Sequence, residues 1–376
     1  MKQNEAIDVL IVGSGPAGMS TALHLLQNEA GWAERVVVVD KAVHPREKLC
    51  GGGITQLGEQ ALAALGLAFE PQSFPVYEAR LTYQDQVYAL RDKPLFRVVR
   101  RDEFDHWLVR QGEKQGVCVR QNEAVMDITV RSDHVEVVTS RSVLQAKAIV
   151  AADGSRSIVR RKLKWAVNGR LARLLEVLTP EVADQQLEFR ENVAVLDFSS
   201  MKDGLQGYVW DFPSFVNGQP WMNRGIFDSR TRPERPRVGL KQELRGTMSK
   251  RGRDLEQYEL KGHPIFWFDK KARFARPRVL LVGDAAGVDP LLGEGISFAL
   301  GYGQVAAAAL VDAFDRQDFS FSDYRERVLA HSILSQLSIR AFVANQVYRI
   351  KSPLILSVFW RLTPLFTRLL TWYNSR

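Results

Sequence analysis

The sequence predicts a mixed α/β protein (α+β overall) with one parallel sheet, one antiparallel sheet and a C-terminal helical region. Three observations support this class. Apolar strands alternate with helices near the N-terminus, aromatic-rich strands fill the middle of the chain, and a strongly apolar stretch closes it. With 376 residues the chain is long enough for two domains, and its composition is that of an ordinary globular protein.

The first element reads as a strand, a glycine-rich turn and a helix. Residues 7–12 are mostly apolar, as in a buried parallel strand, and residues 19–26 have the pattern of a helix. Between them the first glycine allows the tight turn, the second lets the backbone approach a pyrophosphate, and the third lets the helix pack on the strand. The helix N-terminus then offers unpaired N–H groups to phosphates. The residues of this motif are Gly13, Gly15, Pro16, Ala17 and Gly18.

A second apolar strand, residues 36–39, ends at an acid. Asp40 lies about 20 residues after the glycines, the usual place of a carboxylate that hydrogen-bonds a ribose hydroxyl. We expect Asp40 and the adjacent Lys41 at the cofactor. Strand, turn, helix and acid together predict a Rossmann-like domain that binds a dinucleotide.

Two later segments complete the pattern. Residues 152–157 contain Asp153 and Gly154, and residues 283–296 contain the third segment. In this order and at these spacings the three segments indicate FAD, and therefore redox chemistry. The third segment either carries the cofactor or is a plain loop that leads into a helix. Its candidate cofactor residues are Gly283, Asp284, Pro290, Gly293, Gly295 and Ile296.

The remaining elements divide the chain. The pattern predicts helices over 55–66, 101–115, 238–250 and 295–314, short strands over 74–99, a meander over 124–139, strands over 147–151 and 278–282, and β-structure over 189–198, 207–212 and 221–227. We therefore expect a discontinuous FAD-binding domain (1–70, 97–165 and 276–315), a substrate domain (71–96 and 166–275), and C-terminal helices (316–376).

At this point the chain resembles FAD-dependent enzymes with the p-hydroxybenzoate hydroxylase fold, and among them most of all the geranylgeranyl reductases. The narrower resemblance rests on residues 48–54 (KLCGGGI), 208–213 (YVWDFP) and 262–264 (GHP). In the family the aromatic strand runs on to a Gly-x-Gly, and Arg224 stands near its first glycine here. The resemblance covers most of residues 5–310.

The resemblance implies roles for the matched residues. Asp153 and Gly154 would support the cofactor and contact NAD(P)H, so that NADPH is the expected electron donor. Asp284 would bind a ribityl hydroxyl, and Arg101 would contact the flavin nucleotide. The loop 290–295 would bring backbone N–H groups to the N1–O2 edge of the flavin ring. Further residues assigned to the cofactor are Arg46, Cys50, Gly51 and Gly52.

Cys50 is the candidate catalytic residue. It is either a small buried hydrophobe or a proton donor to a substrate carbon, or it controls access to the flavin. Lys48 and Arg46 would lower its pKa. Cys118 is expected in the core, and two cysteines indicate no disulfide framework. We predict no metal site.

Tyr208, Trp210 and Phe212 alternate along one strand and so share a face. This face is either an ordinary aromatic core or the wall of a pocket for a long apolar substrate, which needs few hydrogen bonds.

The C-terminal stretch 354–373 predicts an apolar helix with one polar stripe, formed by Ser357, Arg361, Pro364, Arg368 and Thr371. Two arginines and a proline argue against a membrane span. We expect a helix lying in the membrane interface, with Trp360, Trp372 and Tyr373 at the boundary; a docked terminal helix or a dimer contact is the alternative. From Arg327 onward seven residues are basic and none is acidic.

These observations suggest where the protein works. The N-terminus enters the first strand without an apolar signal region, which favours a cytoplasmic protein that is peripheral on the cytoplasmic membrane face. The net charge of +8 is not spread over a surface suited to nucleic acid, and no obligatory protein partner is evident.

The leading hypothesis is an FAD-dependent reductase that saturates C=C bonds of a prenyl (geranylgeranyl-type) lipid. One alternative is an FAD-dependent monooxygenase or halogenase of an apolar or aromatic substrate. The other is a membrane-associated, non-catalytic redox flavoprotein.

Overall fold

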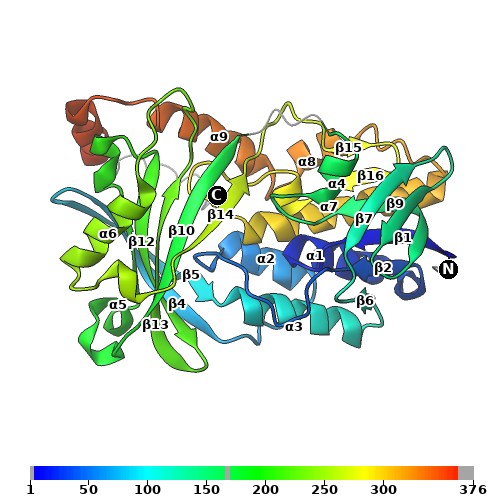
Figure 1. The fold of residues 1–376 in the computed structure, drawn as a ribbon, viewed down its shortest axis with the longest axis horizontal. Coiled ribbons are helices and arrows are strands. Elements are labelled where there is room, and N and C mark those ends of the chain that lie inside the picture. The colour runs from blue at the N-terminus through cyan, green and yellow to red at the C-terminus, as the bar shows by residue number, and fades with distance from the viewer. Residues whose placement is uncertain (1–3, 166–169, 363–376) are drawn as a thin grey trace.

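The computed structural model describes residues 4–165 and 170–362, which form two eight-stranded sheets with helices between and around them (Figure 1). The strands of the first sheet come from three separated parts of the sequence. Its order is β15 (Ala275–Arg276), β16 (Val279–Leu281), β9 (Val143–Ala151), β1 (Asn4–Val12), β2 (Val36–Val39) and β6 (Cys118–Arg120), with β7 (Val125–Val130) and β8 (Val135–Thr139) forming a meander onto β9.

The central strands of this sheet are parallel, and their carboxyl ends are aligned. Val12 of β1 lies beside Val39 of β2 and beside Ala151 of β9, which in turn lies beside Leu281 of β16. The residues that follow these four strands are therefore brought to one edge of the sheet, which is where open α/β sheets bind ligands. The Rossmann-like core is confirmed, with antiparallel additions at β7, β8 and β15.

The second sheet is antiparallel except for the pairing of β11 with β4. Residues 74–99, expected as several short strands, instead form one long hairpin that turns at Gln84, because the polar residues there lie on an exposed hairpin tip. The order is β14 (Lys261–Phe266), β10 (Leu171–Pro180), β13 (Gln219–Asp228), β12 (Gly207–Val216), β11 (Val193–Asp197), β4 (Ser73–Tyr83), β5 (Gln86–Val99) and β3 (Gly53–Thr55).

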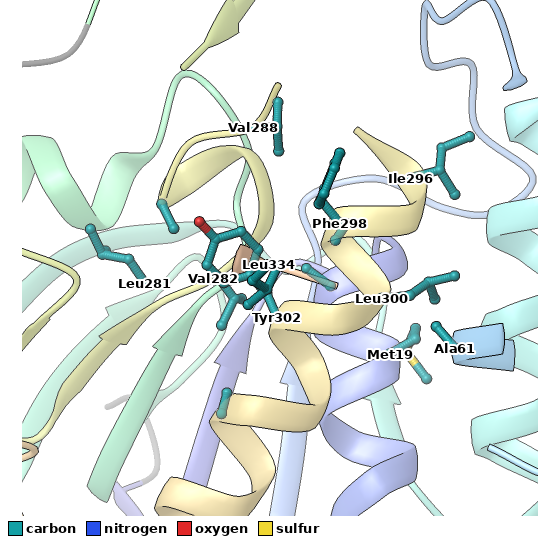
Figure 2. Packing of buried hydrophobic residues seen from close by; sticks show 14 of the residues in the cluster. Met19, Ala61, Leu281, Val282, Val288, Ile296, Phe298, Leu300, Tyr302 and Leu334 are labelled. Carbon is teal, nitrogen blue, oxygen red and sulfur yellow. The ribbon is translucent and has the colours of Figure 1, made fainter. Parts of the chain in front are cut away.

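Helix α7 (Ile296–Arg316) passes through the core beside α1 (Pro16–Asn28). The two helices approach so closely that a Cβ on Gly303 would lie 2.3 Å from the Ser20 hydroxyl, which donates a hydrogen bond to the Leu300 carbonyl. Figure 2 shows side chains of α7 between Met19 of α1 and Val282 after β16. This contact fixes the first and third cofactor segments relative to each other.

The other helices cover the sheets. Helices α2 (Gln56–Ala64) and α3 (Arg101–Lys114) pack near α1, while α6 (Leu240–Lys250) covers the outer face of the second sheet through Leu244 and Ile226. Further helices are α4 (Ile158–Lys162), α5 (Leu187–Arg190), α8 (Tyr324–Ala330) and α9 (Ser335–Val347). Among the described residues only α7 has the length and hydropathy of a membrane span, and 78% of its apolar window is buried in the protein.

Two expectations about side-chain placement are wrong. Cys118 is exposed rather than in the core, because it opens β6, the edge strand of the first sheet. Trp360 is buried rather than at a membrane boundary, because the helix Pro353–Leu362 docks on the second sheet, where Trp360 stacks on Tyr83 and contacts Phe198. Pro364, Arg368, Thr371, Trp372 and Tyr373 lie outside the described residues.

Candidate functional site

The glycines of the first segment occupy positions that a side chain could not share. Gly13 leaves β1 with a φ of +107°, and a Cβ there would lie 2.4 Å from the Ala152 carbonyl oxygen. A Cβ on Gly18 would lie 2.0 Å from the carbonyl oxygen of Gly13. Gly15 is the N-cap of α1, and its nearest neighbour on the open side is the end of the Arg46 side chain, at 3.4 Å. The space in front of Gly15 is therefore open to a pyrophosphate.

Arg46 lies at this helix end, and both Arg46 and Arg101 contact Asp105. Arg101 binds the carboxylate through two hydrogen bonds of 2.7 and 2.8 Å, and Arg46 lies 3.2 Å from it. Burial alone would lower the pKa of Arg101, but the charge and hydrogen bonds of Asp105 raise it above its ordinary value. Arg101 thus stays cationic next to the predicted phosphates. Asp105 was missed from the sequence, although its i,i+4 spacing from Arg101 could have indicated it.

Asp40 lies where the ribose carboxylate is expected, directly after β2. Its carboxylate accepts hydrogen bonds from the backbone N–H of Ser14 at 2.9 Å and from the Ser14 hydroxyl at 2.7 Å. Burial opposes ionisation, but these bonds and the N–H of Ala42 outweigh it and lower the pKa of Asp40. Ser14 also contacts His44 Nε2 at 2.8 Å, and Lys41 next to Asp40 is exposed to solvent.

The second and third segments meet each other across the strand ends. The Ser155 hydroxyl donates to Asp284 Oδ2 at 3.1 Å, and Gly283 approaches Ala17 so closely that a Cβ there would lie 2.8 Å from the Ala17 Cβ. Asp153 accepts from the N–H of Val159, while its Oδ1 is buried and has no partner among the described residues. Burial raises the pKa of Asp153. Gly154 has a φ of +78° and faces open space.

The loop that leads into α7 lies against the second sheet. Gly293, with a φ of +75°, packs on Phe227. Gly295 is the N-cap of α7, and a Cβ there would lie 3.5 Å from Asp284 Oδ1. The Tyr208 hydroxyl donates to the Leu292 carbonyl at 2.6 Å, and the Pro290 carbonyl accepts from Ser229. Ile296 is buried at the start of the helix.

Arg340 of α9 holds this loop from the other side. Its Nη1 lies 2.8 Å from Asp289 Oδ2 and 2.7 Å from Glu294 Oε2. Nothing in the local sequence around Arg340 indicates this role, because it depends on where α9 packs. The contact connects the C-terminal helices to the candidate cofactor loop.

The Cys50 loop lies on the inner face of the second sheet. A Cβ on Gly51 would lie 3.2 Å from the Phe212 ring and 3.6 Å from Trp210 Nε1. Asn223 Nδ2 donates to the Cys50 carbonyl at 3.0 Å. Gly52 donates its N–H to the Cys50 thiol sulfur at 3.4 Å and has a φ of +78°.

Lys48 connects this loop to the third segment. Its Nζ lies 4.0 Å from Asp284 Oδ2 and hydrogen-bonds His263 Nε2. Burial lowers the pKa of Lys48. The pKa of His263 is lowered to about 4 by its own burial and by the nearby charge of Lys48. His263 is therefore neutral at physiological pH, and its Nε2 accepts a hydrogen bond from Lys48. This pair places the 262–264 segment at the same site.

Tyr208, Trp210 and Phe212 lie on one face, as predicted, and all three are buried. They contact the 290–295 loop, which is expected at the flavin ring, and the Cys50 loop, whose residues are also assigned to the cofactor. A role in binding substrate stays a prediction.

These residues fit FAD. The open side of Gly15 and the cationic pair Arg46 and Arg101 would hold the pyrophosphate, and Asp40 would hold the ribose. Asp284 and the loop before α7 would hold the ribityl chain and the ring. Among the described residues no cluster of His, Cys, Asp and Glu is suited to a metal ion.

Two curated proteins show extended sequence similarity. Menaquinone reductase of Mycolicibacterium smegmatis is 28% identical, with 81% of this chain and 76% of that protein covered. Digeranylgeranylglycerophospholipid reductase 2 of Methanosphaera stadtmanae is 26% identical, with 85% and 82% covered.

Solved structures share the fold. A geranylgeranyl bacteriochlorophyll reductase-like protein of Thermoplasma acidophilum has a TM-score of 0.72 at 20% identity, covering 93% of this chain and 92% of that one. The halogenase PltM has a TM-score of 0.73 at 19% identity, covering 96% and 80%. Because reductases and halogenases match equally well, the fold alone does not select the reaction.

The family model described as the FAD binding domain matches residues 6–310, which is most of the chain. That span contains all three segments at the strand ends and the Cys50 loop. The protein therefore belongs to the FAD binding domain family and is an FAD-dependent oxidoreductase.

Proposed function

We propose that this oxidoreductase saturates C=C bonds of a prenyl (geranylgeranyl-type) lipid, with NADPH as the electron donor. The observation that supports it best is the Cys50 loop, which lies on the aromatic face of Trp210 and Phe212 between the flavin segments and the second sheet. An isolated C=C bond offers no polar group for recognition, so the site that binds it needs apolar contacts close to the ring.

Bound FAD would supply the hydride in this reaction. The chain's own residues bind and orient. The glycine turn and its arginines hold the phosphates, Asp284 and Lys48 hold the third segment to the Cys50 loop, and the aromatic face excludes water from the reacting end. Two of the curated relatives are named as reductases, one of them of a digeranylgeranylglycerophospholipid.

NADPH is proposed from the resemblance around Asp153 and Gly154. The structure is consistent with a ligand there, since Gly154 faces open space and the adjacent Arg156 is exposed. Stopped-flow reduction of the bound flavin by NADPH and by NADH tests this assignment. Equal rates with both donors, or reduction by neither, would remove NADPH from the proposal.

A lipid substrate implies contact with a membrane, and the described part of the C-terminal region offers an apolar surface. On the helix Pro353–Leu362 the side chains of Leu354, Ile355 and Val358 are 80%, 58% and 54% exposed. On α9, Ile339 and Phe342 are 64% and 65% exposed. We call these five residues the C-terminal apolar surface. Arg361 and Lys351 beside it would favour anionic headgroups.

Anaerobic turnover tests the reaction. The FAD-loaded protein, NADPH and geranylgeranyl lipids in vesicles are expected to give products that have gained hydrogen, as read by mass spectrometry. Substrate-stimulated oxygen uptake with a hydroxylated or halogenated product would instead favour the monooxygenase or halogenase. No lipid turnover, together with a stable complex with another protein, would favour a redox partner protein.

A further inference from the structure

Glu176 of β10 is a buried carboxyl on the site side of the second sheet. In the sheet register, Glu176 of β10 and Trp210 of β12 both flank Gly225 of β13, so the two side chains share the inner face. A Cβ on Gly225 would overlap the Trp210 ring, which shows that the indole lies across that strand toward Glu176. Glu176 is only 4% exposed.

The two oxygens of this carboxyl are in different surroundings. Oε1 accepts a hydrogen bond from Asn223 Nδ2 at 3.2 Å, the same amide group that holds the Cys50 carbonyl. Oε2 is buried and has no hydrogen-bond partner among the residues that the structure describes. A neutral carboxyl can carry its proton on Oε2, where no described residue accepts it.

The charges around Glu176 do not enforce ionisation. Burial is the largest influence and, with the charge of Glu47, opposes ionisation. Arg100, the N–H of Cys50 and the amide of Asn223 favour the carboxylate but are outweighed. The pKa of Glu176 is therefore raised to about 7. The cation opposite it on β14, Lys261, is engaged by Glu47 at 2.5 Å and by Glu259 at 2.8 Å.

The neighbouring titratable groups also contact other partners. Lys48 and His263 bind each other and approach Asp284, and Arg100 lies 3.4 Å from Asp102. Because burial raises its pKa to about 7, Glu176 is partly protonated at neutral pH, as a general acid has to be.

We propose that Glu176 is the acid that completes the reduction, giving its Oε2 proton to the substrate. This inference rests on the proposed saturation of a C=C bond. A hydride with its electron pair forms a C–H bond to one alkene carbon, and the π pair moves to the neighbouring carbon. That carbon takes the proton of Glu176, which becomes a carboxylate and is reprotonated from water. The product has gained one hydride and one proton, so atoms and electrons balance.

Cys50 is the competing donor, and substitutions at the two residues distinguish them. The thiol sulfur accepts the N–H of Gly52, whereas the unpartnered oxygen belongs to Glu176. Glu176→Gln keeps the size of the side chain and the contact with Asn223 but removes the acid. Glu176→Asp keeps an acid on a side chain shortened by one carbon, and Cys50→Ser tests the rival.

The first readout needs no substrate. Infrared spectra of the FAD-loaded wild type and Glu176→Gln are recorded from about pH 5 to about pH 9. The wild type is expected to show the C=O stretch of a protonated carboxylic acid that disappears near pH 7, and the variant to lack it. A carboxylate at Glu176 throughout this range would overturn the proposal, even if the protein reduces prenyl lipids.

The second readout is single-turnover oxidation of the pre-reduced enzyme by a geranylgeranyl lipid without oxygen. Glu176→Gln is expected to be about 10²- to 10⁴-fold slower and to lose the fall in rate above pH 7, with Glu176→Asp partly restoring both. Wild-type rates in Glu176→Gln, or the large loss in Cys50→Ser alone, would overturn the assignment. If the wild type reduces no prenyl lipid, the proposed function fails, while the infrared titration still decides the state of Glu176.

Discussion

Asn223 holds Cys50 from 173 residues away in the sequence, through an Nδ2 hydrogen bond of 3.0 Å to the Cys50 carbonyl oxygen. The same amide donates to Glu176 and accepts from Trp210 Nε1 at 2.9 Å. One side chain of the second sheet therefore positions the loop expected beside the flavin, the buried acid and an aromatic of the candidate substrate wall.

Replacing this amide should loosen the loop. Asn223→Ala leaves the Cys50 carbonyl and the indole N–H of Trp210 without their partner, and we expect a loss of about 1–3 kcal/mol in the free energy of unfolding, measured with urea. Alkylation of Cys50 by a thiol reagent should become faster. Asn345→Ala, which removes a hydrogen bond on α9, is the control and should leave the alkylation rate unchanged. Unchanged alkylation in Asn223→Ala would show that the loop does not depend on this contact.

The free energy of unfolding should depend on pH through the ionisation of Glu176. The pKa of this carboxyl is raised from 4.5 to about 7 in the folded state, so the folded state binds more protons between these values. The contribution is therefore favourable at low pH and is lost as the pH rises through about 7. Above that pH, Glu176→Gln should be more stable than the wild type by up to about 3 kcal/mol, at 1.36 kcal/mol per pKa unit.

Urea unfolding of both proteins from about pH 5 to about pH 9 measures this difference. Glu34→Gln, at an exposed position, should follow the wild-type curve. Curves for Glu176→Gln and wild type that stay parallel over the whole range would refute a raised pKa at this site.

Alanine substitutions at two glycines of the first segment should have different effects. In Gly18→Ala the new Cβ would lie 2.0 Å from the Gly13 carbonyl oxygen, so the turn itself is disrupted and both Tm and flavin content should fall. In Gly15→Ala only the movable end of Arg46 is near, at 3.4 Å. The fold should survive there, while FAD affinity drops by roughly tenfold or more because the methyl group occupies the pyrophosphate position.

Flavin absorbance per protein and thermal unfolding of the flavin-free proteins separate the two effects. If Gly15→Ala retained full FAD affinity, the pyrophosphate would not lie at this helix end.

The C-terminal apolar surface should bind membranes. Leu354→Asp or Phe342→Asp should weaken binding to anionic vesicles by at least about tenfold, since each removes about 1.5–3 kcal/mol of apolar burial. Met126→Asp is a matched control, because Met126 is 55% exposed but lies on the first sheet. Vesicle co-sedimentation at low and high salt provides the measurement. Equal sedimentation of Leu354→Asp, Phe342→Asp and Met126→Asp would place the membrane contact elsewhere or exclude it.

Local patterns allowed much of the scaffold to be predicted. The strand, turn and helix around Gly13 to Gly18, the acid at Asp40 and the shared face of Tyr208 and Trp210 follow from short-range spacing. The sheet register then explains why segments far apart in sequence meet, since their strands end at the same edge.

The rest depends on long-range packing. Glu176, Asn223 and Arg340 carry no motif, and their roles arise only from strand register or helix docking. Cys118 and Trp360 were misplaced for the same reason. Whether an edge strand exposes a side chain, or a terminal helix finds a partner such as Tyr83, is decided by tertiary contacts.

The most direct test of the central claim is single turnover in D₂O. Pre-reduced, FAD-loaded protein is mixed without oxygen with a geranylgeranyl lipid in vesicles, and the product is analysed by mass spectrometry. Reduction by hydride and proton transfer predicts that each saturated bond gains two deuterium atoms, because the N5 hydrogen of the pre-reduced flavin exchanges with the solvent before it is transferred. An unchanged lipid, with a hydroxylated or halogenated product formed from another substrate only after oxygen is admitted, would contradict the account.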